Sequence, residues 1–219
     1  MVIKTEPIGE YDKRVVLLTL EKGKISAFAK SARRPNNKFL AATNPFCFGE
    51  FKLYAGRSSY NMTDVEISNY FENLRMDFEA AFYGMYFLEI SDYYTRENND
   101  EKNMLKLLYQ SLRALGAKGL DNRLVRSIFE IKAIVVNGEF PGIERVYAMD
   151  RIHGSEEAKR LLDDTKAVIE YINASSIEKL YTFKVSEEVL AQLIRFSNQC
   201  RKCFLDKDFK SIEILENLC

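Results

Sequence analysis

The chain has 219 residues, of which 47% are hydrophobic and 29% charged, and its 32 basic and 32 acidic side chains balance. This is an ordinary composition for a soluble globular protein with one large or two small domains. No run approaches the roughly 18 apolar residues of a membrane helix. The residues after Met1 lack the apolar segment of a signal peptide. We therefore expect a cytoplasmic location and no membrane partner.

The first part of the chain has the pattern of short β-strands. Gly23 lies in a hairpin turn where a positive φ is expected, and Gly49 interrupts an apolar strand, which is typical of a bulge. Five short strands in about 67 residues predict a small closed barrel, and the OB-fold is the leading candidate. Beyond the N-terminal segment, strands are expected over residues 14–20, 24–30, 46–54 and 58–67.

The pattern then changes to the three- and four-residue spacing of amphipathic helices. Asp121 and Ser186 are expected N-caps of two of them. Helices are expected over residues 76–97, 103–115, 123–136, 155–171, 186–204 and 209–215. The fold class is therefore a two-domain α+β protein, with an N-terminal OB-fold β-barrel in residues 1–72 and an all-α helical domain in residues 73–219.

Basic side chains are concentrated between Lys22 and Arg57, where the sequence has eight of them and a single acid, Glu50. Such a surface binds nucleic acid with little sequence preference, because each phosphate that Lys or Arg neutralises releases condensed counterions. Phe28 lies on the polar side of its strand, where it is suited either to stacking on a base or to packing under a loop. The candidate nucleic-acid-binding residues are Lys13, Arg14, Lys22, Lys24, Lys30, Arg33, Arg34, Lys38 and Arg57.

The sequence offers no catalytic set, since it has one histidine, no Walker loop and no G-x-G-x-x-G motif. Cys200 and Cys203 have C-x-x-C spacing, but there is no second pair for a structural zinc site. The flanking residues place both in the middle of a helix, one toward the core and one on a flank. We expect reduced helical cysteines, with a redox pair as the alternative. No metal, cofactor or enzymatic activity is expected.

The aromatic residues between Phe78 and Tyr94 have helical spacing, which favours packing in a core; a groove for a partner peptide is the alternative.

Several ordered runs resemble one known family. Residues 3–5, 9–19 and 21–25, followed by Ala32-Arg33-Arg34-Pro35, closely resemble the bacterial recombination mediator family RecO, and residues 183–190 and 209–211 resemble its last helices. The resemblance implies an N-terminal OB domain, binding to single- and double-stranded DNA and annealing of complementary strands. It also implies partnership with RecR and with the C-terminal tail of single-stranded-DNA-binding protein, to load the RecA recombinase at gaps. The DNA-contact positions that it implies are Lys24, Lys30, Arg33, Arg34 and Lys38.

The chain departs from that family in one respect. Many members carry a four-cysteine zinc motif after the segment that matches residues 137–141, whereas residues 142–150 contain no cysteine. The zinc site is therefore not carried over.

Two functions are consistent with these features. The first is a nucleoid-associated DNA repair and recombination mediator. The second is a protein-interaction adaptor whose helical domain docks a partner peptide and whose barrel binds nucleic acid only weakly. In either case a docking site is expected to combine an apolar pocket with basic residues for the partner's carboxylates. The candidates are Lys106, Arg113, Arg123, Arg126 and Lys132, and for each of them the alternative is a solvated helix face.

Overall fold

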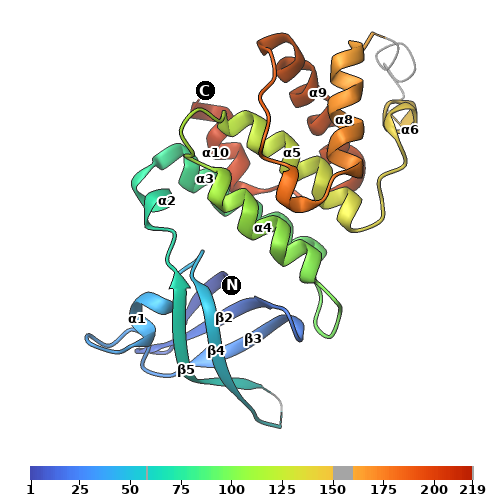
Figure 1. Ribbon diagram of the computed structural model, residues 1–219. Helices are drawn as coiled ribbons and strands as arrows, with labels where there is room; N and C mark the ends of the chain where they lie inside the picture. The colour runs from blue at the N-terminus through green and yellow to red at the C-terminus, as the bar shows by residue number, and fades with distance from the viewer. Residues whose placement is uncertain (58, 150–159, 219) are drawn as a thin grey trace. The chain divides into compact units, whose positions relative to one another are not determined.

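The computed structural model describes residues 1–57, 59–149 and 160–218, and in it the chain forms two compact units (Figure 1). The first unit contains residues 1–105 and the segment from Ser211 onward, and the second contains Lys106–Lys210. Among the described residues no helix is both long and apolar enough to cross a membrane.

The first unit contains a five-stranded sheet in the order β1-β2-β3-β5-β4. Neighbouring strands are antiparallel except for β3 and β5, which are parallel. This is the five-stranded, partly open Greek-key arrangement of an OB-fold, as the strand pattern predicts. The strands are β1 (Val2–Ile8), β2 (Asp12–Thr19), β3 (Gly23–Ala29), β4 (Phe48–Ala55) and β5 (Tyr60–Asn69).

The sheet is not closed into a barrel, so the expected closed barrel is wrong. The edge strands β1 and β4 are not hydrogen-bonded neighbours in the sheet. The amide of Val2 donates to the Cys47 carbonyl over 2.9 Å, and the amide of Phe46 donates to the Val2 carbonyl over 3.1 Å. This pairing ends directly before a register shift between Phe48 and Gly49. A bulge bends and twists the strand pair that carries it. After the bulge, β4 is no longer hydrogen-bonded to β1 as a neighbouring strand.

The two glycines have the roles that the sequence predicts. Gly23 has φ +63°, and a Cβ there would lie 2.3 Å from the Arg96 carbonyl oxygen. A Cβ on Gly49 would lie 2.1 Å from the carbonyl oxygen of Glu66 on β5. Gly23 therefore supplies backbone freedom, whereas Gly49 allows the close approach of two strands at a bulge.

The sheet encloses a small core of its own. Fully buried Val15 and Leu17 on β2 pack with Ile25 on β3 and Met62 on β5. The short helix α1 (Phe39–Ala42) closes one end of the sheet beside β5 (Figure 1) and contributes the buried side chain of Phe39. This core fixes the side of the strands that faces solvent, because side chains alternate along each strand.

Helices continue the first unit after the sheet. α2 (Glu72–Met76) leads into α3 (Phe78–Tyr94), which packs against β1. The C-terminal helix α10 (Lys210–Leu218) belongs to this unit as well, and the Ser211 hydroxyl donates to the Glu89 carboxylate on α3 over 2.9 Å. The predicted packing of the aromatic residues holds for Tyr83, Tyr86 and Phe87, which are buried, while Phe78 remains 63% exposed.

The second unit is helical. α4 (Lys102–Ala114) begins in the first unit and continues into the second. α5 (Asn122–Val136) lies against both α8 (Asp163–Ala174) and α9 (Glu187–Phe204) (Figure 1). Asp121 and Ser186 cap α5 and α9 as predicted, since their side chains accept hydrogen bonds from the amides of Arg123 and Val189. The remaining elements are α6 (Ile143–Met149) and the 3₁₀ helix η1 (Ile177–Lys179).

Of the helix expected over residues 155–171, the structure has α8 from Asp163; residues 160–162 are not helical, and the expected start at Ser155 lies outside the described residues. A side chain from a distant helix contacts the start of α8. The amide of Leu162 and the hydroxyl of Thr165 both donate to the side-chain oxygen of Gln192 on α9, over 3.0 and 2.7 Å. Gln192 thus satisfies the amide of the N-cap residue Leu162, as the N3 side chain of a capping box would.

Candidate nucleic-acid interface

Residues 30–38, here called the basic loop, follow β3 and pack against the turn between β1 and β2. The amide of Ser31 donates to the Asp12 carboxylate over 2.7 Å, and the amide of Arg33 donates to the Tyr11 carbonyl over 2.8 Å. Inside the loop, the amide of Arg34 donates to the Ser31 carbonyl over 3.0 Å. These backbone bonds fix the loop before any ligand arrives, which lowers the ordering cost of binding.

The two arginines of the basic loop are exposed and lie against the same turn. Arg33 donates from Nη1 to the carbonyl oxygens of Gly9 and Glu10, over 3.4 and 3.2 Å. The guanidinium of Arg34 lies over the ring of Tyr11. A hydrogen bond with the Glu10 side chain raises the pKa of Tyr11, so the phenol stays neutral at physiological pH. Both arginines keep free N–H groups for a phosphate.

The solvent side of β2 and β3 adds a further cation beside the loop. Arg14 lies directly opposite Phe28 in the strand register, and its Nε donates to the Ser26 hydroxyl over 2.8 Å. Phe28 is half-buried and Lys30 is exposed. An aromatic ring with cations on both sides is the combination that single-stranded nucleic acid favours, because bases stack on the ring while phosphates contact the cations.

Three of the candidate lysines are already engaged inside the unit. Lys24 donates to the carboxylate and carbonyl oxygens of Asp92 on α3, over 2.9 and 2.5 Å. Lys13 donates to oxygen atoms of Leu40, Thr43 and Asn44 around α1, and burial lowers the pKa of its ammonium. The third, Lys38, forms an ion pair with Asp64. These bonds hold the helices and strands in place and reduce the charge that is available to DNA.

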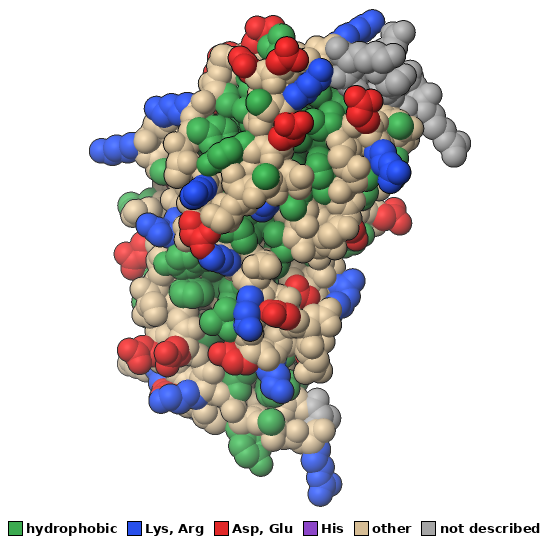
Figure 2. All heavy atoms as spheres, turned by 45° about the vertical axis from the view of Figure 1, so that its right-hand side comes forward, with side chains coloured by type: hydrophobic (Ala, Val, Ile, Leu, Met, Phe, Trp, Pro, Cys, Tyr) green, Lys and Arg blue, Asp and Glu red, His purple; other side chains and the backbone are tan. Residues whose placement is uncertain are grey.

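The remaining candidates lie away from the basic loop. Lys22 is exposed at the opposite end of β3 from Lys30, and Arg57 is exposed in the turn between β4 and β5. The structure therefore brings together Lys30, Arg33 and Arg34 of the loop with Arg14. Figure 2 shows one face of the molecule, on which basic and acidic side chains are interspersed and form no continuous basic patch.

Sequence reasoning missed two residues of this region, Tyr11 and Asp64. Tyr11 lies in the turn between β1 and β2, one of the loops with which OB-folds bind oligonucleotides. Asp64 pairs with Lys38, 26 residues earlier in the sequence. The sequence around Tyr11 entered only through the family resemblance, and no sequence pattern indicated the Asp64 contact.

Two of the candidate partner-binding residues support the helical unit from inside. Arg126 is 9% exposed and donates to Glu130 and Asn198, over 3.0 and 2.7 Å. The ammonium of Lys132 donates to the carbonyl oxygens of Ile172, Asn173 and Ser175, over 2.9, 2.9 and 2.7 Å. Lys132 therefore caps the C-terminal end of α8, where carbonyl groups lack helical partners.

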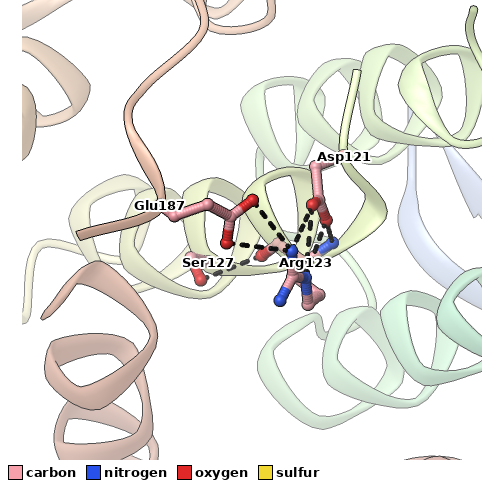
Figure 3. A network of polar contacts seen from close by, with 4 residues as sticks. All are labelled: Asp121, Arg123, Ser127 and Glu187. Atoms are coloured by element: carbon pink, nitrogen blue, oxygen red, sulfur yellow. Dashed lines mark hydrogen bonds and ion pairs between the residues drawn. The ribbon is translucent and has the colours of Figure 1, made fainter. Parts of the chain in front are cut away.

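The other three candidates lie on the surface. Arg123 joins the starts of α5 and α9, with its guanidinium 2.7 Å from Asp121 and 3.4 Å from Glu187 (Figure 3). In the same network the Ser127 hydroxyl donates to the Arg123 carbonyl. Lys106 pairs with Glu178, and Arg113 is exposed at the end of α4.

An apolar groove of about 630 Å³ lies in the second unit, between α8 and the segment that leads into α9. The rings of Tyr171 and Phe183 meet edge to face in it, with centroids 5.4 Å apart. Arg123 does not line the groove; it forms an ion pair with Glu187, which follows the lining residue Ser186 in the sequence. The groove is also lined by Asp164, Ala167, Val168, Lys184, Val185 and Val189.

Both cysteines are helical, as the sequence predicts, but they lie near the C-terminal end of α9 rather than in its middle, since Cys203 directly precedes the last helical residue, Phe204. Cys200 is fully buried and Cys203 is partly exposed, as expected for one residue toward the core and one on a flank. Burial raises the pKa of the Cys200 thiol well above its usual value, which makes it unreactive. Within residues 1–57, 59–149 and 160–218, no group of three or more histidine, cysteine or acidic side chains is arranged to hold a metal ion.

Comparison with known proteins adds a further finding. The model of the recombination protein O N-terminal domain matches residues 1–71, and the model of its C-terminal domain matches residues 75–213. The DNA repair protein RecO of Acetivibrio thermocellus is 26% identical over all of this chain and 95% of its own length. That of Clostridium novyi is 27% identical over all of this chain and 92% of its own. A third, from Symbiobacterium thermophilum, is 36% identical over 65% of this chain and 56% of its own.

Proposed function

Since this chain belongs to the recombination protein O family, whose relatives named above are DNA repair proteins, we propose that it is a DNA-binding mediator of recombinational repair. It binds single- and double-stranded DNA and anneals complementary strands. With RecR, it helps to load RecA onto single strands that are coated by single-stranded-DNA-binding protein. It acts by binding, without turnover of a small molecule and without a cofactor, in the cytoplasm at the nucleoid.

The observation that carries this proposal is the exposure of Arg33 and Arg34 on a loop that is already fixed by backbone hydrogen bonds. Each of these two guanidinium groups can form two parallel hydrogen bonds with a phosphate, and the rigid turn holds them ready to do so. The rings of Tyr11 and Phe28 next to them are suited to stacking on bases. No base-specific contact is required for annealing, because the strands recognise each other by pairing.

We assign the principal DNA contacts to Arg14, Lys30, Arg33 and Arg34. Lys38 contributes once its partner Asp64 releases it. Lys22 and Arg57 contact DNA only where the bound DNA extends beyond the basic loop. Lys13 and Lys24 are reassigned to structural bonds. Residues 1–72 then act as the DNA-binding domain, and residues 73–219 provide partner docking and additional DNA contact. The break between the two family-model matches, after residue 71 and before residue 75, supports this division.

Partner docking requires a site in the helical region, because a mediator acts on DNA that another protein already covers. We assign it to the groove beside Tyr171 and Phe183, with Arg123 and Lys184 as cations for an acidic tail. An aromatic-lined groove with nearby cations matches a peptide that carries an apolar anchor and carboxylates. Lys106 and Arg113 lie outside the groove lining and are weaker candidates.

Calorimetry with the full-length chain tests this docking site. A peptide with the acidic, aromatic-ending tail of single-stranded-DNA-binding protein is expected to bind with micromolar affinity. The double variant Tyr171→Ala/Phe183→Ala should lose at least tenfold in affinity, whereas Tyr109→Ala, a change of a half-buried tyrosine outside the groove, should leave it unchanged. Equal binding by the two variants would place the peptide elsewhere.

The groove also favours a second function, a protein-interaction adaptor that contacts nucleic acid only weakly. The two functions are separated by binding of a labelled oligonucleotide over a salt series. A steep loss of affinity between about 50 and 200 mM salt is expected for a mediator that neutralises several phosphates. Weak binding that does not respond to salt would instead support the adaptor.

A further inference from the structure

Asp64 on β5 lies between Lys38 of the basic loop and Lys52 of β4. Its Oδ1 is 2.5 Å from the ammonium of Lys38, and its Oδ2 is 3.3 Å from the ammonium of Lys52. The exposed fractions of the three side chains lie between 44% and 71%. Hydrogen bonds from Lys38 first and Lys52 second lower the pKa of Asp64 to about 2, so the carboxylate is fully charged near neutral pH.

A β-bulge turns Asp64 toward these lysines. Lys52 is opposite Asp64 in the strand register, whereas the next residue of β4, Leu53, is opposite Met62, so Thr63 is an extra residue in β5. Met62 is buried in the sheet core. In a regular strand Asp64 would share the side of Met62, because side chains two residues apart point the same way. The extra residue reverses that direction, and the Thr63 hydroxyl supports the bulge by donating to the Lys52 carbonyl over 3.0 Å.

We propose that Asp64 is an internal substitute for a DNA phosphate, which holds Lys38 and Lys52 in the free protein and competes with DNA for them. This inference rests on the proposed DNA-binding function and adds a control to the same surface. A carboxylate oxygen accepts the same charge-assisted hydrogen bonds from an ammonium as a phosphate oxygen does. Lys38 is the last residue of the basic loop, so Asp64 determines how many cations the loop presents.

The exchange has a direct cost for DNA binding. When phosphates take over the two lysines, Asp64 loses both partners and its negative charge remains beside the DNA backbone. Asp64 therefore weakens the complex and speeds its dissociation, which suits a protein that must leave the strand after pairing or loading. Exposed ion pairs are individually weak, so the expected gain on removing the carboxylate is up to about fivefold for each lysine released.

The test compares Asp64→Asn with Glu66→Gln. Both substitutions remove one negative charge from the same strand, and Glu66 is exposed and opposite Glu50 rather than a lysine. The Asn side chain keeps an acceptor for the Val65 amide, which bonds to the Asp64 carboxylate. Affinity for a labelled single-stranded oligonucleotide is measured by fluorescence anisotropy over a salt series, after thermal unfolding has confirmed that each variant is folded.

Asp64→Asn is expected to bind more tightly than Glu66→Gln by about three- to tenfold at low salt. Its log–log salt slope should be steeper by up to about 1.4 units, since each freed lysine adds about 0.7 on single-stranded DNA. In a Lys38→Ala/Lys52→Ala background the same substitution should have no larger effect than Glu66→Gln, because no cation is left to release.

If Asp64→Asn and Glu66→Gln increase DNA affinity equally, or if the increase survives removal of both lysines, the effect comes from net charge alone. Either result would overturn the inference and leave the proposed DNA binding intact. An Asp64→Asn variant that is folded and binds no more tightly than the unmodified protein would also overturn it. If the unmodified protein does not bind DNA at all, the proposed function fails, and this inference fails with it.

Discussion

The guanidinium carbon of Arg34 lies 4.4 Å from the centroid of the Tyr11 ring. This contact joins the basic loop to the turn between β1 and β2, and the Arg33 amide adds a backbone bond to the Tyr11 carbonyl. A cation over an aromatic face is held without loss of its charge or of its in-plane donors. Tyr11 therefore orients Arg34 while leaving it available to a phosphate.

Replacement of Tyr11 tests this orientation. Tyr11→Phe keeps the ring and is expected to bind DNA as the unmodified protein does. Tyr11→Ala removes the ring and should weaken binding by about two- to fivefold, the size of a cation–π contact at an exposed site. The salt slope should stay the same, because no cation is removed. Anisotropy titrations of both variants decide the matter, and an equal loss in Tyr11→Phe would mean that the hydroxyl, not the ring, is important.

The titration of Asp64 provides a second prediction. Because its folded pKa is lowered, the two ion pairs contribute their full stability above about pH 4, the unfolded range of a carboxyl group, and lose it as the pH falls through about 2. Carboxyl carbon NMR should give a pKa near 2 in the unmodified protein and a value closer to 3.8 in Lys38→Ala/Lys52→Ala. A pKa that does not change with the two lysines absent contradicts the contact.

Lys132 is expected to be a structural residue rather than a docking residue. Its ammonium satisfies three carbonyl oxygens at the end of α8, and its removal leaves partly buried acceptors without that donor. Lys132→Ala should lower the free energy of unfolding by about 2–4 kcal/mol. Lys179→Ala, a change of an exposed lysine on η1, should lie within about 0.5 kcal/mol of the unmodified protein. Urea unfolding followed by circular dichroism measures both, and similar values for the two would remove Lys132 from its assigned role.

The cysteines of α9 should differ in reactivity. In a Cys219→Ser background, Ellman's reagent is expected to modify the partly exposed Cys203 before the buried Cys200. Cys203→Ser should abolish the fast phase, and Cys200→Ser should keep it. A fast phase that depends on Cys200 would point to a reactive thiol and revive the redox alternative.

Local sequence patterns predicted those features whose causes are local. The turn at Gly23, the bulge at Gly49 and the N-caps Asp121 and Ser186 each depend on a few neighbouring residues, and the structure confirms all four. The strand count and the change to helices followed from hydrophobic periodicity in the same way.

Features that depend on distant partners were not predictable in this way. Lys24 and its partner Asp92 are 68 residues apart, and Lys132 is 40 residues from the Ile172 carbonyl that it contacts. A count of local charge therefore includes lysines that are engaged inside the fold. The start of α8 is contacted by Gln192, 30 residues beyond Leu162, and the open sheet depends on where pairing with β1 ends.

The central claim is that the basic loop binds DNA through its cations, and the salt slope of the triple variant Arg33→Ala/Arg34→Ala/Lys38→Ala tests it most directly. The control is Lys118→Ala/Lys179→Ala/Lys202→Ala, which removes the same charge from exposed positions of the helical unit. On duplex DNA the loop variant should have a slope shallower by about 1.8 to 2.7 units, at about 0.9 for each contact, with a smaller change in the control. A folded loop variant whose slope equals that of the unmodified protein would contradict the account.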